Sequence, residues 1–373
     1  MKEKYLFLYL KTGGGHISTA KALERYFAQN FSDTEIVLAD GFQETNKMVQ
    51  SIVIDGYTKA QTYGKGMYEF LYLCNKSYPF AKLNQHLMSF FTKPYLQKLI
   101  QQERPSKIVI FHFFLVKPVL KALKELGLDI PVVTVVTDPF TGTRTRFMEK
   151  DIDYVVFSER IKHYALDLGV AEKNIKVFPP IIHEKFLIPI DKEKIPDIKK
   201  LHHISLDKKV ILLLGGGDGL PKGKTILKEL AQSKTGAHII IVCGRNKNLF
   251  DQAHKIKSDY PQLSLQIHGF VDFAHDLLNA SDIVISKGGP ATIFEILLCG
   301  KIPLIHTYMR EQEKGNVEFV VDNKVGKYEK NIKKLTHIAA QMLDGDLSSY
   351  QDAIKNLDLK IGTKEIAEYI KSL

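Results

Sequence analysis

Tryptophan is absent from this 373-residue sequence, cysteine occurs only three times, and no apolar run approaches the length of a membrane span. A transmembrane helix needs about 18 or more consecutive apolar residues, so none is expected. The cysteines, Cys74, Cys243 and Cys299, have neither disulfide nor metal-ligand spacing and lie in apolar surroundings. We therefore expect buried, reduced thiols in a cytoplasmic protein.

The sequence shows no secretory signal and carries fewer acidic than basic residues. Its charged first residues, 1–4, lead directly into a short apolar segment and then glycines, so no signal peptide is expected. The formal net charge of +10 favours an acidic partner such as a nucleotide, a nucleic acid or an anionic membrane. A chain of this length, 45% apolar, can fill the cores of two domains.

Short segments rich in Ile and Val alternate with segments of helical spacing. The apolar segments are residues 5–10, 107–111, 131–136, 154–157, 210–214, 237–242, 265–267, 283–285 and 302–305. This alternation predicts an α/β fold with parallel sheets buried on both faces. Residues 183–203 carry two prolines and many charges and interrupt it. We expect one domain at 1–180, a linker at 181–204 and a second domain at 205–349.

The most informative motif follows the predicted strand 283–285. Gly288 and Gly289 form a turn that opens a helix, where backbone N–H groups and the helix dipole suit an anion such as a diphosphate. Glu295 lies about one helical turn further on, within reach of paired hydroxyls such as those of a ribose. A Gln/Glu/Asn cluster at 312–316 would suit a sugar. The pattern therefore predicts a nucleotide-sugar site.

A second glycine run follows the first predicted strand, residues 5–10. Gly13, Gly14 and Gly15 give backbone freedom where a strand turns into a helix, so a ligand can approach bare main chain. His16 stands at the start of that helix. Two interpretations remain open: a ligand-facing corner, or a structural turn with a helix-capping histidine.

Taken in order, these motifs resemble glycosyltransferase family 28. The matching segments are residues 13–16 with Ala20 and Leu23, residues 136–138, 215–217, 288–295 and 312–316. Within the family, monogalactosyldiacylglycerol synthases and bacterial diacylglycerol glucosyltransferases are most similar, over roughly residues 5 to 330. The resemblance implies the GT-B fold, in which two Rossmann-like domains face a central cleft. It also implies that a C-terminal helix, about 350–373, returns to the first domain.

The resemblance further implies a UDP-sugar donor on the C-terminal domain and a membrane lipid acceptor such as diacylglycerol on the N-terminal domain. The donor-binding candidates are Gly215, Gly216, Gly217, Arg245, Phe270, Val271, Gly288, Gly289, Thr292, Glu295, Gln312, Glu313 and Asn316. The acceptor-side candidates are Gly13, Gly14, Gly15, Arg144 and Arg146. Asp138 is the predicted general base, although Thr-Asp-Pro is also a common strand ending, and His16 is the second candidate.

The sequence departs from the family beyond Asp138, where relatives usually carry a histidine and a tryptophan. Arg144 and Arg146 stand there instead and would suit an anionic headgroup or phosphate, as in a phospholipid or polyprenyl-phosphate acceptor. Two other functions also remain open. One is a UDP-sugar 2-epimerase, although none of that family's motifs is found, and the other is a non-catalytic sensor of UDP-sugars.

Three further motifs do not fit their usual function. Residues 219–225 resemble a P-loop but are one residue short, and residues 13–18 lack the third glycine of a dinucleotide fingerprint. Asp151 and Asp153 resemble a metal-holding Asp-x-Asp, yet they precede a strand. Helix dipole and glycine amides could stabilise the leaving diphosphate instead. No metal site and no cofactor other than the donor are predicted.

The segment from residue 57 to 95 holds ten aromatic residues, and residues 59–98 hold six lysines against one acid, Glu69. Aromatic rings and lysines together suit the interface of an anionic membrane. An ordinary helical insertion with core aromatics is the alternative. Single-stranded nucleic acid would also fit, but no nucleic-acid motif accompanies the segment. We expect peripheral association with the inner face of the cell membrane and no nucleic-acid partner.

Overall fold

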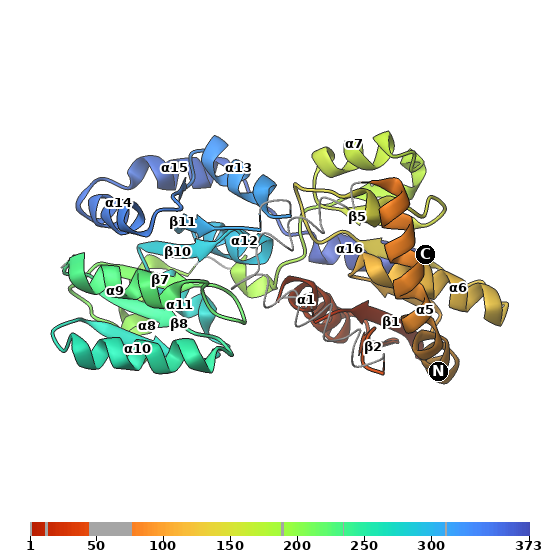
Figure 1. The fold of residues 1–373 in the computed structure, drawn as a ribbon, viewed down its shortest axis with the longest axis horizontal. Coiled ribbons are helices and arrows are strands. Elements are labelled where there is room, and N and C mark those ends of the chain that lie inside the picture. The colour runs from red at the N-terminus through yellow and green to blue at the C-terminus, as the bar shows by residue number, and fades with distance from the viewer. Residues whose placement is uncertain (1, 12–13, 45–76, 188–189, 234, 310–311) are drawn as a thin grey trace. The chain divides into compact units, whose positions relative to one another are not determined.

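The computed structural model describes residues 2–11, 14–44, 77–187, 190–233, 235–309 and 312–373. The chain divides into two units, each of which has its own sheet (Figure 1). The first unit comprises Met1–His183, Arg310–Gln312 and Lys360–Leu373, and the second comprises Glu184–Met309 and Glu313–Leu359.

The first unit contains a six-stranded sheet in the order β2-β1-β3-β4-β5-β6, and every strand pair is parallel. Its strands are β1 (Glu3–Tyr9), β2 (Thr34–Asp40), β3 (Lys107–Ile110), β4 (Val132–Val135), β5 (Asp153–Val156) and β6 (Ile175–Val177). Its helices are α1 (Gly15–Asn30), α5 (Tyr78–Glu103), α6 (Val116–Leu126), α7 (Glu159–Asp167) and α16 (Thr363–Ser372), with short 3₁₀ turns η2 (Phe113–Leu115), η3 (Arg144–Phe147) and η4 (Glu172–Asn174).

Helices cover both faces of this sheet, so the strand interiors are apolar on both sides. In β1, alternate residues enter different cores, as the two-residue period of a strand requires. Leu6 and Leu8 pack in the core that includes residues of α5, α6 and α7. Tyr5 and Phe7 pack in the core formed with α1 and α16.

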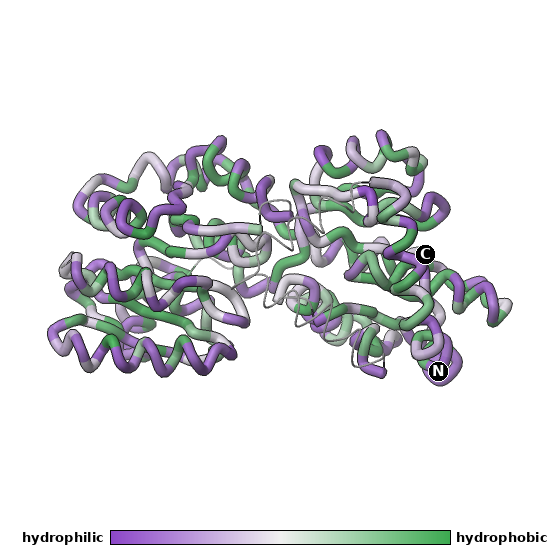
Figure 2. Tube along the Cα trace, in the orientation of Figure 1, coloured by the Kyte–Doolittle hydropathy of each residue, from purple (hydrophilic) through white to green (hydrophobic). Residues whose placement is uncertain are grey.

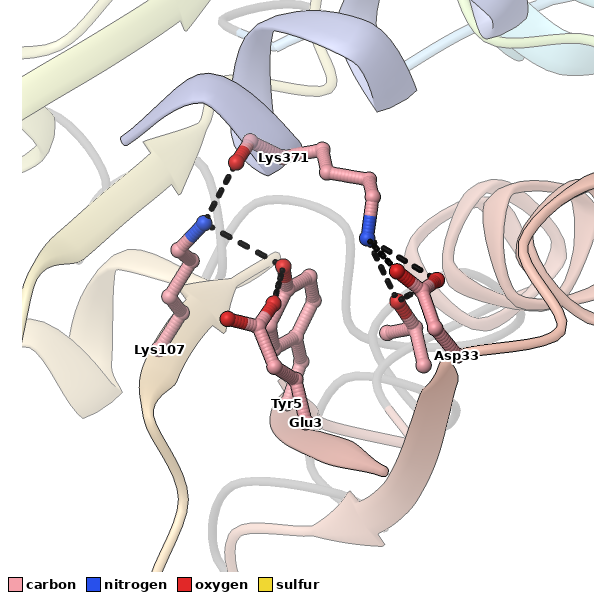
Figure 3. A network of polar contacts seen from close by, with 6 residues as sticks. Glu3, Tyr5, Asp33, Lys107 and Lys371 are labelled. Atoms are coloured by element: carbon pink, nitrogen blue, oxygen red, sulfur yellow. Dashed lines mark hydrogen bonds and ion pairs between the residues drawn. The ribbon is translucent and has the colours of Figure 1, made fainter. Parts of the chain in front are cut away.

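The C-terminal helix α16 is fixed to the first unit by two lysines (Figure 3). The Lys371 ammonium lies 2.8 Å from an Asp33 carboxylate oxygen and also donates to Thr34. The Lys107 ammonium donates to the Lys371 carbonyl oxygen at 2.7 Å and to the Tyr5 hydroxyl at 3.2 Å. These contacts tie the end of the chain to the amino ends of β1, β2 and β3.

The second unit also contains a six-stranded parallel sheet, in the order β12-β11-β10-β7-β8-β9. Its strands are β7 (Val210–Leu214), β8 (His238–Val242), β9 (Leu265–His268), β10 (Ile283–Lys287), β11 (Ile302–Thr307) and β12 (Lys327–Tyr328). Its helices are α8 (Ile195–Leu201), α9 (Gly223–Ser233), α10 (Lys247–Asp259), α11 (Ala274–Ala280), α12 (Pro290–Leu298), α13 (Lys314–Asp322), α14 (Ile332–Asp344) and α15 (Ser348–Asn356), with 3₁₀ turns η5 (Glu184–Phe186) and η6 (Lys192–Lys194).

The predicted α/β class with parallel sheets is confirmed by both units. Apolar residues concentrate in the strands, whereas outer helices such as α10 are largely polar (Figure 2). The observed division differs from the expected boundaries at two places. The expected linker contains α8, which packs against α11 in the second unit. In the C-terminal segment only α16 belongs to the first unit, because α15 packs its buried Ile354 into the second core.

The structure bears on two further expectations, which concern the cysteines and a membrane-spanning helix. Cys243 is a buried free thiol whose pKa is raised to about 11 by burial, and Cys299 is a partly buried free thiol; Cys74 lies outside the described residues. Among the helices that the structure describes, none is long and apolar enough to cross a bilayer.

Candidate functional site

Three loops of the second unit meet at the carboxyl edge of its sheet, after β7, β8 and β9. The Arg245 N–H donates to the Gly217 carbonyl oxygen at 2.8 Å, and the Gly244 N–H donates to the Gly269 carbonyl oxygen at 3.2 Å. Gly244 has a φ of +59°, and a Cβ there would lie 2.3 Å from the Gly217 oxygen. Only glycine fits this backbone contact, so the loops are held together by main chain.

Gly216 connects the β7 loop to the amino end of α12. Its φ is +78°, and a Cβ built there would meet the Thr292 hydroxyl at 3.9 Å and nothing closer. Gly289 caps α12 with no side-chain hydrogen bond, and Pro290 is the first helical residue. The first-turn amides of a helix have no intrahelical acceptor, so this junction suits a diphosphate. The structure thus brings together Gly216, Gly289 and Thr292, as the sequence predicts.

Arg245 and Phe270 form an accessible cation–aromatic pair beside these loops. The guanidinium carbon lies 5.4 Å from the centre of the Phe270 ring, and one guanidinium nitrogen lies 3.2 Å from Asp218. The Phe270 side chain is 63% exposed, which is unusual for a large aromatic residue. Val271, the next residue, is half-buried. The pair offers a flat surface on which a nucleobase could stack.

Glu295 lies in the middle of α12, one turn beyond Thr292. Burial raises the pKa of its carboxyl group to about 7, and the charge of Lys185 acts in the opposite direction. Within the described part of the chain, the Glu295 carboxyl group forms no hydrogen bond or ion pair, although its backbone carbonyl oxygen accepts the Cys299 N–H. Burial without a partner destabilises the charged form of a carboxyl group, and a hydrogen bond from a bound ligand removes part of this destabilisation. Such a group is suited to accept hydrogen bonds from ligand hydroxyls.

Glu313 and Asn316 were expected to contact a sugar, but both are already engaged inside the second unit. Glu313 accepts a hydrogen bond from the Met309 N–H at 2.7 Å and lies 3.3 Å from the Lys287 ammonium. The Asn316 amide donates to the Gly288 carbonyl oxygen at 2.8 Å. Both side chains are almost fully buried. Their geometry is that of residues that hold the Gly288 turn in place.

In the first unit, His16 lies in the first turn of α1 and does not cap the helix. Gly14 is the N-cap, and the His16 Nδ1 atom instead contacts the Thr137 hydroxyl at 2.8 Å. Burial lowers the pKa of His16 to about 4, and the charge of Asp138 offsets only part of this shift. His16 is therefore a neutral imidazole at neutral pH.

His112 is a second buried imidazole in the same place. Its ring centre lies 4.7 Å from that of His16, edge to face, and it stacks on Phe113. Its Nδ1 accepts the Phe114 N–H, which leaves the proton of the neutral ring on Nε2. Burial, with His16 and Arg146 adding to it, lowers the pKa of His112 well below its ordinary value. The sequence analysis missed His112, although it follows a buried strand just as Asp138 does.

Asp138 is buried and forms an ion pair with Arg146, which is also buried. The guanidinium carbon of Arg146 lies 5.4 Å from the centre of the Phe113 ring. The Gln312 amide lies 3.3 Å from one Asp138 oxygen and 3.4 Å from the other. Asp138 is therefore not a solvated turn residue. The structure places Gln312 with Asp138, whereas Glu313 belongs to the second unit.

The remaining acceptor-side candidates differ in their surroundings. Arg144 is half-buried at the start of η3. A Cβ added to Gly15 would meet nothing within 4 Å, so this glycine borders open space. Gly13 lies outside the described residues.

The two carboxylates of the Asp-x-Asp motif, Asp151 and Asp153, differ in their surroundings. Asp151 is exposed before β5, and Asp153 hydrogen-bonds with Tyr369. In the described ranges no group of three or more His, Cys, Asp or Glu side chains is arranged to hold a metal ion.

Comparison with known families gives two matches that follow one another along the chain. Residues 16–182 match the model of monogalactosyldiacylglycerol (MGDG) synthase. Residues 210–370 match the glycosyltransferase family 28 C-terminal domain. The first match covers β2 to β6 of the first sheet, and the second covers all six strands of the second sheet.

Similar curated proteins come from plants and from bacteria. A probable monogalactosyldiacylglycerol synthase of Nicotiana tabacum is 27% identical over 91% of this chain and 64% of its own length. A processive diacylglycerol beta-glucosyltransferase of Bacillus pumilus is 27% identical over 99% of this chain and 94% of its own length. The chain thus spans slightly less than two thirds of the plant relative and nearly all of the bacterial one.

Solved structures with low sequence identity share the fold. MurG of Acinetobacter baumannii has a TM-score of 0.61 at 15% identity, with both chains fully covered. A putative UDP-N-acetylglucosamine 2-epimerase of Listeria monocytogenes has a TM-score of 0.64 at 14% identity and covers 100% of this chain and 95% of its own. These similarities confirm the GT-B fold that the resemblance implied. Together with the two family matches, they lead to one assignment: the chain belongs to glycosyltransferase family 28.

Proposed function

We propose that the protein transfers a hexose from a UDP-sugar to a membrane lipid, with diacylglycerol as the acceptor. The observation that carries this proposal is the junction of Gly216 with the amino end of α12, followed by the unpartnered Glu295. A diphosphate and a ribose need these groups in this order. The acceptor class follows from the relatives, which are named for diacylglycerol as substrate or for its monogalactosyl product.

In the proposed donor complex, the diphosphate lies against the first-turn amides of α12 and the glycines after β7. Glu295 accepts the ribose hydroxyls, and the base stacks near Arg245 and Phe270. Gln312 is the candidate for direct contact with the sugar. Glu313 and the Asn316 amide nitrogen support the Gly288 turn and its surroundings, whereas the Asn316 Oδ1 atom is buried without a hydrogen-bond partner.

Transfer requires removal of a proton from the acceptor hydroxyl as its oxygen attacks the anomeric carbon. We assign removal of this proton to the Asp138 carboxylate, which its ion pair with Arg146 orients. The bond from the anomeric carbon to the diphosphate breaks, and UDP leaves with its negative charge on the amides of α12. His16 is the second candidate base. Its neutral ring could also orient the acceptor hydroxyl.

We propose no cofactor beyond the donor itself. The helix dipole and glycine amides supply the stabilisation that a leaving diphosphate needs, so the proposed mechanism has no step that uses a metal. We further propose that the protein works at the cytoplasmic face of the cell membrane, held there peripherally by an anionic surface. A lipid acceptor has to be reached at the bilayer, and the net charge of +10 favours anionic headgroups.

The experiment is incubation with a radiolabelled UDP-sugar and a lipid extract, followed by separation of lipid and aqueous products. A labelled glycolipid that co-migrates with a diacylglycerol product supports the proposal. A labelled polyprenyl-linked product would move the acceptor to a lipid phosphate, bound by Arg144. A soluble isomer of the sugar would identify an epimerase, and absence of turnover with retained UDP binding would identify a sensor.

A further inference from the structure

Helix α5 has an inverted distribution of polar and apolar residues in its first four turns. The residues that face the protein, Ala81, Gln85, Ser89 and Thr92, are at most 2% exposed, and three of them are polar. Beyond Pro94 the pattern becomes ordinary, with Leu96 and Ile100 fully buried. Surface helices normally point their apolar stripe inward. The first part of α5 does the reverse.

The outward face of this segment is an apolar stripe, Pro79, Leu83, Leu87, Phe90 and Pro94, hereafter the α5 stripe. At 100° per residue these five positions fall within an arc of about 80° on the helix. All five are exposed, and Phe90 reaches 75% and Leu83 58%. Phe91, 38% exposed, packs edge to face on the Phe90 ring. Isolated exposed apolar residues are common, but a continuous stripe indicates an interaction surface.

Cationic side chains border the stripe on the side of α6. Lys82 lies next to the stripe, and Lys117 and Lys121 stand one turn apart on α6, which packs against α5. The pKa of Lys117 is lowered mainly by burial, and Glu149 opposes this shift. The charges of Lys121 and Lys82 also lower it, so the three lysines are close enough to interact. Within the described residues none of these three lysines forms an ion pair.

We propose that the α5 stripe is a membrane-docking surface that inserts into the headgroup region of an anionic bilayer, with Lys82, Lys117 and Lys121 contacting the anionic headgroups. This inference rests on the proposed function, because it names the surface through which the enzyme reaches a lipid acceptor. A second copy of the chain would cover the stripe, but its own formal net charge of +10 would disfavour contact with three lysines. An anionic bilayer satisfies both features.

The same helix also contacts the segment that carries the acceptor-side arginines. The Gln85 amide donates to the Thr145 carbonyl oxygen at 3.1 Å, and Thr145 directly precedes Arg146, the partner of Asp138. Thr145 and Arg146 are both buried beneath this part of α5. The polar inner face of α5 therefore supports η3, while its apolar outer face docks on lipid. Docking through α5 places the Asp138 side of the first unit near the bilayer.

Flotation with vesicles of equal parts phosphatidylcholine and phosphatidylglycerol, compared with pure phosphatidylcholine, tests the proposal. The triple variant Leu83→Gln, Leu87→Gln, Phe90→Gln should lose at least about tenfold in binding to the mixed vesicles. Its matched control, Leu128→Gln, Leu201→Gln, Val321→Gln, changes three exposed aliphatic residues elsewhere and should float like the wild type. Circular dichroism and thermal unfolding verify that both variants are folded.

A second pair of variants tests the lysines. Lys82→Gln, Lys117→Gln, Lys121→Gln should lower binding to the anionic vesicles and leave binding to neutral ones unchanged. Lys255→Gln, Lys257→Gln, Lys333→Gln, three exposed lysines of α10 and α14, removes the same charge and should change binding less. Equal losses in the two lysine variants would overturn the assignment of Lys82, Lys117 and Lys121.

The two proposals fail separately. Unchanged flotation of the Leu83/Leu87/Phe90 variant would overturn the docking surface. Sedimentation that shows a dimer for the wild type and a monomer for this variant would also overturn it. If docking is correct, the variant loses transfer on vesicles but keeps transfer to a short-chain diacylglycerol below its micelle concentration. If the wild type transfers to no acceptor, the proposed function fails, while flotation still decides the docking surface.

Discussion

The raised pKa of Glu295 makes the proposed donor site sensitive to pH in a defined direction. With a pKa of about 7, the carboxyl is about half protonated at neutral pH before a ligand binds. Ribose hydroxyls donate hydrogen bonds, and such bonds favour the charged carboxylate. Donor binding should therefore select the ionised form and release a proton. Donor affinity should fall as the pH decreases.

The size of the effect follows from the fraction of free protein that is already ionised. With a pKa of about 7, about nine tenths of Glu295 is ionised near pH 8 and about one tenth near pH 6. The dissociation constant should therefore rise roughly tenfold over this range, which corresponds to about 1.4 kcal/mol. Lys185 favours the ionised form, so its removal should shift the pH dependence to higher pH.

Isothermal titration with UDP-glucose and with UDP-galactose, in buffers of different ionisation enthalpy, measures both the affinity and the number of protons released. A nucleotide sugar is the suitable ligand because each of its phosphates carries one ester and one anhydride bond, so neither has a proton that titrates over this pH range. The isosteric variant Glu295→Gln resembles the protonated acid. Its affinity should be independent of pH and no higher than that of the wild type near pH 6.

Two results would refute this reasoning. Affinity that is flat between about pH 6 and about pH 8 would mean that Glu295 does not ionise on donor binding. A Glu295→Gln variant with the full pH dependence of the wild type would assign the proton to another group. Glu295→Ala should in either case lose at least about 1.5 kcal/mol of donor affinity if the ribose contact is correct.

Further predictions concern the other site residues. Asp138→Asn should keep donor affinity in titration yet lose transfer by on the order of 100-fold or more, and near-normal turnover would make His16 the leading base. Gly216→Ala should weaken UDP binding, because the methyl group would point toward Thr292 into the space proposed for the diphosphate, whereas Gly236→Ala, also at positive φ but away from the proposed site, should cost stability alone. The pKa of His16 is about 4 in the folded protein and about 6.5 in the unfolded chain. This difference contributes about 3 kcal/mol to the free energy of unfolding. The contribution should be present above about pH 6.5 and lost as the pH falls to about 4. Chemical denaturation of wild type and His16→Gln across that range measures it, and equal pH slopes would contradict the burial argument.

The parts of the site that follow from backbone pattern could be predicted from the sequence. A Gly-Gly turn between an apolar strand and a helical repeat has few possible geometries, so the position of Glu295 one turn into α12 was predictable. What Glu313 and Asn316 contact was not, because tertiary packing pairs Glu313 with the Met309 N–H and the Asn316 amide nitrogen with the Gly288 carbonyl oxygen. The Asp138–Arg146 ion pair was likewise hidden, because it joins two loop segments whose positions are set by tertiary packing, including the contact of η3 with α5.

The inverted polarity of α5 shows another limit of pattern reading. The stripe of Leu83, Leu87 and Phe90 has the spacing of an ordinary core-facing helix, and only the burial of Gln85 and Ser89 reveals which side faces the protein. The lysine-rich part of the predicted membrane segment that includes Lys59, Lys65 and Lys76 lies outside the described residues, so its membrane contact stays a prediction.

The most direct test of the proposed function is the stoichiometry of the reaction with one defined acceptor. The purified protein is incubated with a labelled UDP-hexose and diacylglycerol in anionic vesicles, and UDP and glycolipid are quantified in the same samples. The account predicts equal amounts of UDP and lipid-linked hexose, both of which fall together in Asp138→Asn. Release of UDP without glycolipid, in the presence of vesicle-bound and folded protein, would contradict it.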